Sequence, residues 1–399
     1  MMLRALIPFA VLMIVLAAAG SCETTPPQPV VWTPPSGDVT AEVPQTGLNP
    51  EPAPADDQPA PTPTEPVELT LLPPLPDNVN PLTGLVVANP DLLNRRPVMV
   101  KVSNYPRTGR PHAGLTYADI VFEYYIGYGF NRFMAVYLGQ DAERVGPVRS
   151  GRLVDAQLAE MYQGLLFYGN ADDKVDEVLL EELGSRALAE KFIPSPPKYR
   201  IDGEIMETTL FVNTAELTDY VNRLNQVSNS RRDLRGMIFS DEIHPINEPA
   251  SFLAVQFSRQ ARGEWVYNNE TSLYERWIES GVSEETIDMI PLVDRLNNQQ
   301  VTAANVVILY ATYTEFAPTL HDIAIFDQNA GKRAIFFRDG LRMEGTWKAV
   351  SNGRPIMLFN SYDLPYHLKP GNTWFILVGD LSTFRATAPG QWELRFDIP

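Results

Sequence analysis

Cysteine is almost absent from this chain of 399 residues, in which Cys22 is the only one. A single cysteine excludes disulfide bonds within the chain, so the fold must be stable through packing alone. The four histidines are scattered through the sequence, and no pair has the spacing of a helix-borne zinc site. The sequence therefore predicts neither a metal site nor a bound cofactor.

Basic residues are absent from a long stretch near the start. Between Glu23 and Asn94 there are ten acidic residues and no lysine or arginine, so much of the net charge of −17 lies there. The remainder, from Arg95 onward, is only mildly acidic. Without a basic stripe, the counterion release that drives binding to nucleic acid is missing. We therefore expect no nucleic-acid partner.

Long apolar runs are absent after Cys22, but one precedes it. Arg4 is followed by an apolar run from Ala5 to Ala19 and by the small residues Gly20 and Ser21. This pattern is typical of an export signal, and a cysteine at the cleavage position resembles the lipobox of bacterial lipoproteins. We expect residues 1–21 to be a signal peptide and Cys22 to be acylated.

Acylation of Cys22 leaves no thiol for catalysis and makes the lipid bilayer a partner of the chain, because two or more acyl chains hold a protein on a membrane stably. The expected location is the extracytoplasmic face of the bacterial cell membrane. Two alternatives remain open, a plain secretory signal and an N-terminal membrane helix. The run is short for a bilayer of about 30 Å, and it contains Pro8.

Proline dominates the next segment. Seventeen of the 35 prolines lie between Cys22 and Leu82, and no periodic apolar pattern accompanies them. Such a sequence has too little apolar surface to offset the entropy lost on ordering. Residues 22–79 are therefore predicted to be a lipidated, proline-rich, disordered linker.

The rest of the chain predicts an α+β protein with two mixed α/β domains and mixed β-sheets. Residues 80–235 combine strand patterns at 98–104, 120–128, 132–138 and 165–168 with helical patterns at 153–162, 172–183 and from Asn213 onward. Residues 236–399 contain mostly runs of β-branched and aromatic residues, so the second domain is predicted to be predominantly β.

Several short motifs recur in the same order as in a known family. The chain resembles the YerB-like bacterial lipoproteins, whose two halves are domains of unknown function. The resemblance implies two mixed α/β domains behind a lipidated N-terminus, and it brings no catalytic residues with it. The motifs that carry it are Pro81–Gly84, Asn94–Pro97, Ala118–Glu123, Asn131–Val136, Val145–Arg152, Gly345–Trp347 and Pro370–Trp374.

The turn from Gly146 to Arg152 is the strongest candidate for a ligand site. It joins a predicted strand to a predicted helix, so we expect Ser150 to cap that helix. A helix N-terminus flanked by Arg149 and Arg152 suits a carboxylate or a phosphate, and Arg132 is a further candidate from the preceding strand. The alternative is structural, with these arginines paired to acidic residues such as Asp119, Glu123 or Asp155.

The same carboxylates allow a different function. Asp119 and Glu123 are the candidate acid and base of a hydrolase that acts on the cell wall, if their carboxyl groups are about 5–10 Å apart in an open cleft. No other catalytic constellation is evident. The preferred hypothesis is a non-catalytic binding or accessory protein of the envelope, which recognises an envelope component or an anionic small molecule.

Overall fold

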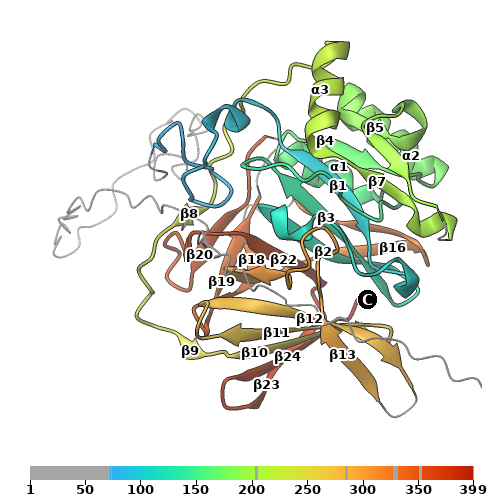
Figure 1. The fold of residues 1–399 in the computed structure, drawn as a ribbon. Helices are drawn as coiled ribbons and strands as arrows, with labels where there is room; N and C mark the ends of the chain where they lie inside the picture. Colours follow the sequence, from blue (N-terminus) through green and yellow to red (C-terminus); the bar gives the residue numbers. More distant parts are fainter. Residues whose placement is uncertain are drawn as a thin grey trace, which may run out of the picture.

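The computed structural model describes residue 72 and residues 74–202, 205–283, 286–326, 331–349 and 353–398. The predicted lipidation site Cys22, the predicted signal peptide and nearly all of the predicted linker lie outside these residues. Within them, a smaller β-sheet packs on one face of a large β-sheet, and two helices cover the opposite face of the large sheet (Figure 1). No helix in the described part of the chain is long and apolar enough to cross a membrane.

The large sheet has eleven strands and is built from both halves of the sequence. Its two halves meet where β2 pairs in parallel with β22. Strands from before and after the predicted domain boundary near residue 235 therefore belong to the same sheet. In sheet order the strands are β20 (Met357–Asn360), β19 (Leu341–Lys348), β18 (Lys332–Arg338), β15 (Asn305–Ala311), β22 (Thr373–Gly379), β2 (Ile120–Gly127), β3 (Phe130–Tyr137), β1 (Val98–Ser103), β4 (Leu165–Tyr168) and β5 (Ala187–Ala189), and β9 (Glu248–Pro249) pairs with β19.

The second sheet comes wholly from the C-terminal half, and three further strand pairs stand apart from both sheets. In sheet order its strands are β13 (Ile287–Pro291), β12 (Leu273–Val282), β11 (Ala261–Asn268), β10 (Phe252–Ser258), β24 (Gln391–Arg395) and β23 (Thr383–Ala388), and β14 (Thr302–Ala303) pairs with β12. The separate pairs are β16 (Tyr313–Ala317) with β17 (Leu320–Ile323), β21 (His367–Leu368) with β8 (Ile238–Phe239), and β6 (Lys198–Arg200) with β7 (Leu210–Val212).

Local sequence signals mark the ends of two α-helices in the described part of the chain. In α2 (Asp173–Leu183), the side chain of Asp172 accepts a hydrogen bond from the backbone N–H of Lys174, and Gly184 ends the helix. In α3 (Thr214–Leu224), Asn213 plays the same capping role. Helices α1 (Leu153–Met161) and α2 pack on one face of the large sheet, and α3 packs on the other.

The burial of the central strands explains their composition. β15 and β22 are buried along their whole length, because the large sheet is covered on both faces where they lie. Strands of this kind are apolar on both faces rather than alternating. The mixed sheets and the strand-rich C-terminal half confirm the predicted α+β class.

A buried ion pair joins the two sheets. Both carboxylate oxygens of Glu123 in β2 accept from Arg276 Nη2 in β12, at 2.9 and 3.0 Å. Trp374 Nε1 in β22 donates to the same carboxylate at 2.8 Å, and the side chains of Glu123 and Arg276 are each 1% exposed. A Cβ atom at residue 263 would lie 2.1 Å from Arg276 Nη2, so glycine at this position leaves the room that the guanidinium group occupies.

Replacing Glu123 with glutamine leaves the positive charge of Arg276 buried without its counter-charge. We expect Glu123→Gln to lower the free energy of unfolding by about 3–5 kcal/mol, measured by urea denaturation. The control is Glu264→Gln, which breaks a partly exposed pair with Arg262 and is expected to cost about 1 kcal/mol or less. Equal losses in the two variants would contradict a structural role for the inter-sheet pair.

Candidate functional site

The turn before α1 is fixed by backbone hydrogen bonds to three other segments. Val148 N–H donates to Leu210 O, Arg149 N–H to Lys101 O at 3.0 Å, and Gly151 N–H to Asn170 O at 2.9 Å. The side chains of the turn therefore have defined positions, although the segment contains no regular secondary structure of its own.

The structure brings the predicted ligand-binding residues together. Arg132 projects from β3, and its Nη1 donates to the carbonyl oxygen of Ser150 at 2.7 Å. Arg152 Nη1 donates to Gly151 O at 2.7 Å. Arg149, Ser150 and Arg152 are partly exposed, whereas Arg132 is buried. We call the side chains of Arg132, Arg149 and Arg152 the arginine cluster.

Ser150 does not cap the helix, contrary to the sequence-based expectation. The N-cap of α1 is Arg152, two residues later, and the carboxylate of Asp155 accepts a hydrogen bond from the Arg152 N–H at 2.7 Å. Asp155 at the third helical position thus provides the acidic half of a capping box. Ser150 contributes its carbonyl oxygen to Arg132 instead.

The arginine cluster places like charges side by side. The pKa of Arg132 lies well below its ordinary value because of burial and of the neighbouring charges on Arg152 and Arg149. Burial also lowers the pKa values of Arg149 and Arg152. The Nε atoms of Arg149 and Arg152 are buried without a hydrogen-bond partner among the described residues. The charge of Asp155 opposes the lowering of the pKa at Arg132 and Arg152, and the charge of Glu207 opposes it at Arg149.

The acidic residues that were candidate partners of these arginines are engaged elsewhere. Glu123 pairs with Arg276. Asp119 accepts from the backbone N–H groups of Leu138 and Gly139, at 2.6 and 2.9 Å, and from a side-chain amide. The Asp155 carboxylate accepts a hydrogen bond from the backbone N–H of Arg152, not from its guanidinium group. In the described part of the chain, no carboxylate forms a salt bridge with the arginine cluster.

A buried triad that sequence reasoning missed lies beneath the arginine cluster. Lys101 Nζ in β1 lies 3.0 Å from Asp155 Oδ1 and also contacts the hydroxyl of Tyr124, which donates to the same carboxylate oxygen. All three residues are fully buried. The available signal was a lysine with valines on both sides in the buried strand β1 (Val98–Ser103).

Burial dominates the ionisation of this triad. Burial lowers the pKa of Lys101 to about 7, and the positive charges of Arg132 and Arg152 lower it further. The carboxylate of Asp155 has the opposite effect, but a weaker one. Burial and the Asp155 charge raise the pKa of Tyr124 well above its ordinary value. Three carboxylates, those of Asp155, Asp172 and Glu207, act on the four basic side chains of the site, which leaves one positive charge in excess when Lys101 is protonated. This excess suits an anion.

Asp119 and Glu123 do not have the geometry of a catalytic pair. They lie four residues apart, Asp119 just before β2 and Glu123 within it, so their Cα atoms are about 13 Å apart along an extended chain. Both side chains are buried and accept several hydrogen bonds. Burial raises the pKa of Asp119 to about 6, although the groups that donate to it favour its charged form.

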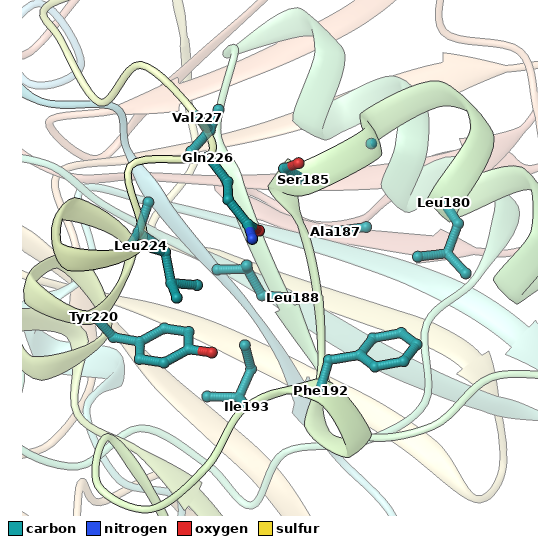
Figure 2. Close-up of a pocket in the computed structure, with 12 residues that line it drawn as sticks. Leu180, Ser185, Ala187, Leu188, Phe192, Ile193, Tyr220, Leu224, Gln226 and Val227 are labelled. Atoms are coloured by element: carbon teal, nitrogen blue, oxygen red, sulfur yellow. The ribbon is translucent and has the colours of Figure 1, made fainter.

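The described residues outside the arginine cluster offer little for metal binding or catalysis. No group of three or more histidine, cysteine, aspartate or glutamate side chains in the described ranges could hold a metal ion. An open apolar groove of about 290 Å³ lies between α2, β5 and α3, where Leu188 is flanked by Phe192, Ile193 and Tyr220 (Figure 2). Its lining contains no charged side chain and none of the arginine cluster.

Comparison with known proteins places this geometry in context. Residues 82–227 match the domain family described as "Protein of unknown function (DUF3048) N-terminal domain", and residues 253–375 match its C-terminal counterpart. The "Putative lipoprotein YerB" of Bacillus subtilis (strain 168) is 27% identical over 316 residues, which cover 75% of this chain and 86% of that protein. A crystal structure of YerB protein from Bacillus subtilis shares the fold, with a TM-score of 0.62 and 24% identity over 76% of this chain and 97% of that chain.

The ionisation of Lys101 predicts a pH dependence of stability. Between pH 7 and about 10, the unfolded chain retains a proton that folded Lys101 has released, because the ordinary lysine pKa is 10.5. The contribution of Lys101 to the free energy of unfolding therefore rises with pH in this window. We expect Lys101→Met to flatten the rise in urea denaturation at successive pH values. The exposed control Lys174→Met should keep the wild-type slope, and an unchanged slope in Lys101→Met would contradict the assignment.

Proposed function

The chain belongs to the YerB-like family, and from this premise we propose that it is a lipid-anchored protein of the bacterial cell envelope that binds an anionic ligand without converting it. The anchor is acylated Cys22, the linker is the proline-rich segment that follows, and the ligand site is the arginine cluster with Ser150. The location proposed for the folded part is the extracytoplasmic face of the membrane.

Two observations support the anchor. Cys22 follows a basic residue, an apolar run and two small residues, as in lipoprotein signals. The relative from Bacillus subtilis carries the word lipoprotein in its name. A linker of more than 50 residues would allow the folded part to reach well beyond the lipid surface, at up to about 3.1 Å per residue.

The surplus of positive charge in the arginine cluster carries the binding proposal. No carboxylate in the described part of the chain forms a salt bridge with Arg132, Arg149 or Arg152, and the charges of Asp155, Asp172 and Glu207 offset only part of the positive charge. Guanidinium groups offer forked donors that fit the oxygens of phosphate or carboxylate. An anion at this site would neutralise the remaining positive charge and accept hydrogen bonds from the partly exposed Arg149 and Arg152.

The alternative of a wall hydrolase has less support. A glycosidase of the common type needs two carboxyl groups that face one cleft. Glu123 accepts hydrogen bonds from Arg276, Trp374 and an asparagine, and Asp119 accepts from two backbone N–H groups and a side-chain amide. Both carboxyl groups are buried, and the two residues do not face one cleft, so we favour binding over catalysis.

The anchor predicts that Cys22→Ser releases the protein from the membrane. We expect the wild-type chain, expressed in a bacterial host, to incorporate labelled fatty acid and to sediment with membranes, whereas Cys22→Ser does neither. Thr24→Ser, two residues later, serves as the control. Fatty-acid labelling that persists in Cys22→Ser would contradict the assignment of the anchor.

The arginine cluster predicts stabilisation by simple anions. For the full chain in detergent, inorganic phosphate at about 100 times its Kd should add about 2.7 kcal/mol to the free energy of unfolding, seen as a rise in Tm relative to chloride at equal ionic strength. The double variant Arg149→Ala/Arg152→Ala should lose this rise.

The control has the same change in net charge at a different place. Arg385→Ala/Arg395→Ala removes two largely exposed arginines of β23 and β24, which pair with Glu393. It should keep the phosphate-dependent rise in Tm. An equal loss in both double variants would show that phosphate acts through net charge alone, and no rise in the wild-type protein would contradict the proposed site.

A further inference from the structure

The hairpin tip between β2 and β3 holds an exposed tyrosine on a fixed support. Tyr128 is 69% exposed and lies between Gly127 and Gly129, both of which have positive φ angles. A Cβ atom at Gly127 would lie 1.9 Å from Pro318 O, and Ser258 Oγ donates to Gly129 O at 2.6 Å. Turns from two other hairpins thus pack against the tip. These contacts fix the backbone at Tyr128, while its side chain remains exposed to solvent.

A stacked aromatic pair adjoins this tip. The rings of Tyr105 and Phe130 have centroids 3.9 Å apart and are nearly parallel, with an interplanar angle of 20°. Tyr105 is 38% exposed, and Phe130, the first residue of β3, is partly exposed. We call Tyr105, Tyr128 and Phe130 the aromatic platform. Large exposed aromatic side chains on a fixed support are typical of binding surfaces.

The platform lies beside the arginine cluster. Phe130 and Arg132 are two residues apart in β3, so their Cα atoms are about 7 Å apart and their side chains point to the same face of the sheet. Asn131 between them points to the opposite face, where it donates to Glu123. The other member of the stacked pair, Tyr105, follows β1, whose last residue Ser103 pairs with Arg132. Aromatic faces and guanidinium groups are therefore neighbours at one end of the sheet.

We propose that the anion bound by the arginine cluster is the phosphate of a sugar phosphate, whose ring stacks on the aromatic platform. This inference rests on the proposed function and specifies its ligand. Aromatic rings pair an apolar face with a polar edge, which suits the C–H faces and hydroxyl groups of a sugar. The three guanidinium groups favour the two negative charges of a phosphate monoester over the single charge of a carboxylate.

Two other ligand classes would use the same features less well. A nucleic-acid strand needs an extended basic groove, whereas the chain from Arg95 onward is mildly acidic. A bilayer surface rich in anionic lipids attracts several exposed basic residues, whereas Arg132 is buried and Arg149 and Arg152 are only partly exposed. A compact ligand with one phosphate and one ring matches the site best.

The test compares three ligands on the full chain in detergent by isothermal titration calorimetry: inorganic phosphate, N-acetylglucosamine 1-phosphate and adenosine monophosphate. We expect the sugar phosphate to bind about tenfold more tightly than inorganic phosphate. Tyr128→Ala and Tyr105→Ala should each remove most of this advantage and leave the affinity for inorganic phosphate unchanged, because stacking of one ring is worth roughly that factor. Tyr362→Ala is the control, since Tyr362 is 60% exposed elsewhere on the surface.

The outcomes separate the two proposals. The inference fails, and the proposed anion site stands, if inorganic phosphate binds as tightly as the sugar phosphate. The same holds if the higher affinity for the sugar phosphate persists in both Tyr128→Ala and Tyr105→Ala. If neither phosphate binds, the proposed function fails as well. A greater gain for adenosine monophosphate than for the sugar phosphate would overturn the sugar and identify a nucleotide site. In a parallel co-sedimentation assay with phosphatidylglycerol vesicles, tyrosine-dependent binding without sugar-phosphate binding would equally overturn it.

Discussion

The pairing of β2 with β22 is the constraint on which the rest of the structure depends. It joins strands about 250 residues apart in the sequence, and it makes one sheet from the two halves of the chain. The ion pair between Glu123 and Arg276 then fixes the second sheet against this joint. A carboxylate buried between two sheets is stable only where its partners are complete. The position of β2, and with it the start of β3, therefore depends on residues from both halves.

The sequence could predict what is local. Strands β1 to β4 and helices α1 to α3 were expected close to their observed bounds, because alternation, helical periodicity and capping residues act over a few positions. The partner of β2 could not be predicted, since parallel strands far apart in the sequence leave no local signal of their pairing. Arg276 was overlooked for the same reason, because its role is defined by Glu123 and by the space above Gly263.

The candidate site shows the same division. The turn from Gly146 to Arg152 was recognised from its composition, and the structure places Arg132 beside it. The identity of the N-cap was predicted wrongly. The helix begins after Arg152, whose backbone N–H donates to Asp155, and not after Ser150. Sequence reasoning also missed Lys101, whose partner Asp155 is 54 residues away. Burial of a lysine becomes interpretable only once its neighbours in space are known.

The buried triad links the site to the body of the protein. One oxygen of Asp155 accepts hydrogen bonds from Lys101 and Tyr124 of the sheet, and the other accepts from the backbone N–H of Arg152. This carboxylate therefore fixes both the start of α1 and the position of the turn before it. The surrounding arginines lower the pKa of Lys101, and an anion among them would oppose that effect. Ligand binding and protonation of Lys101 should therefore favour each other, because each binding event reduces the electrostatic cost of the other.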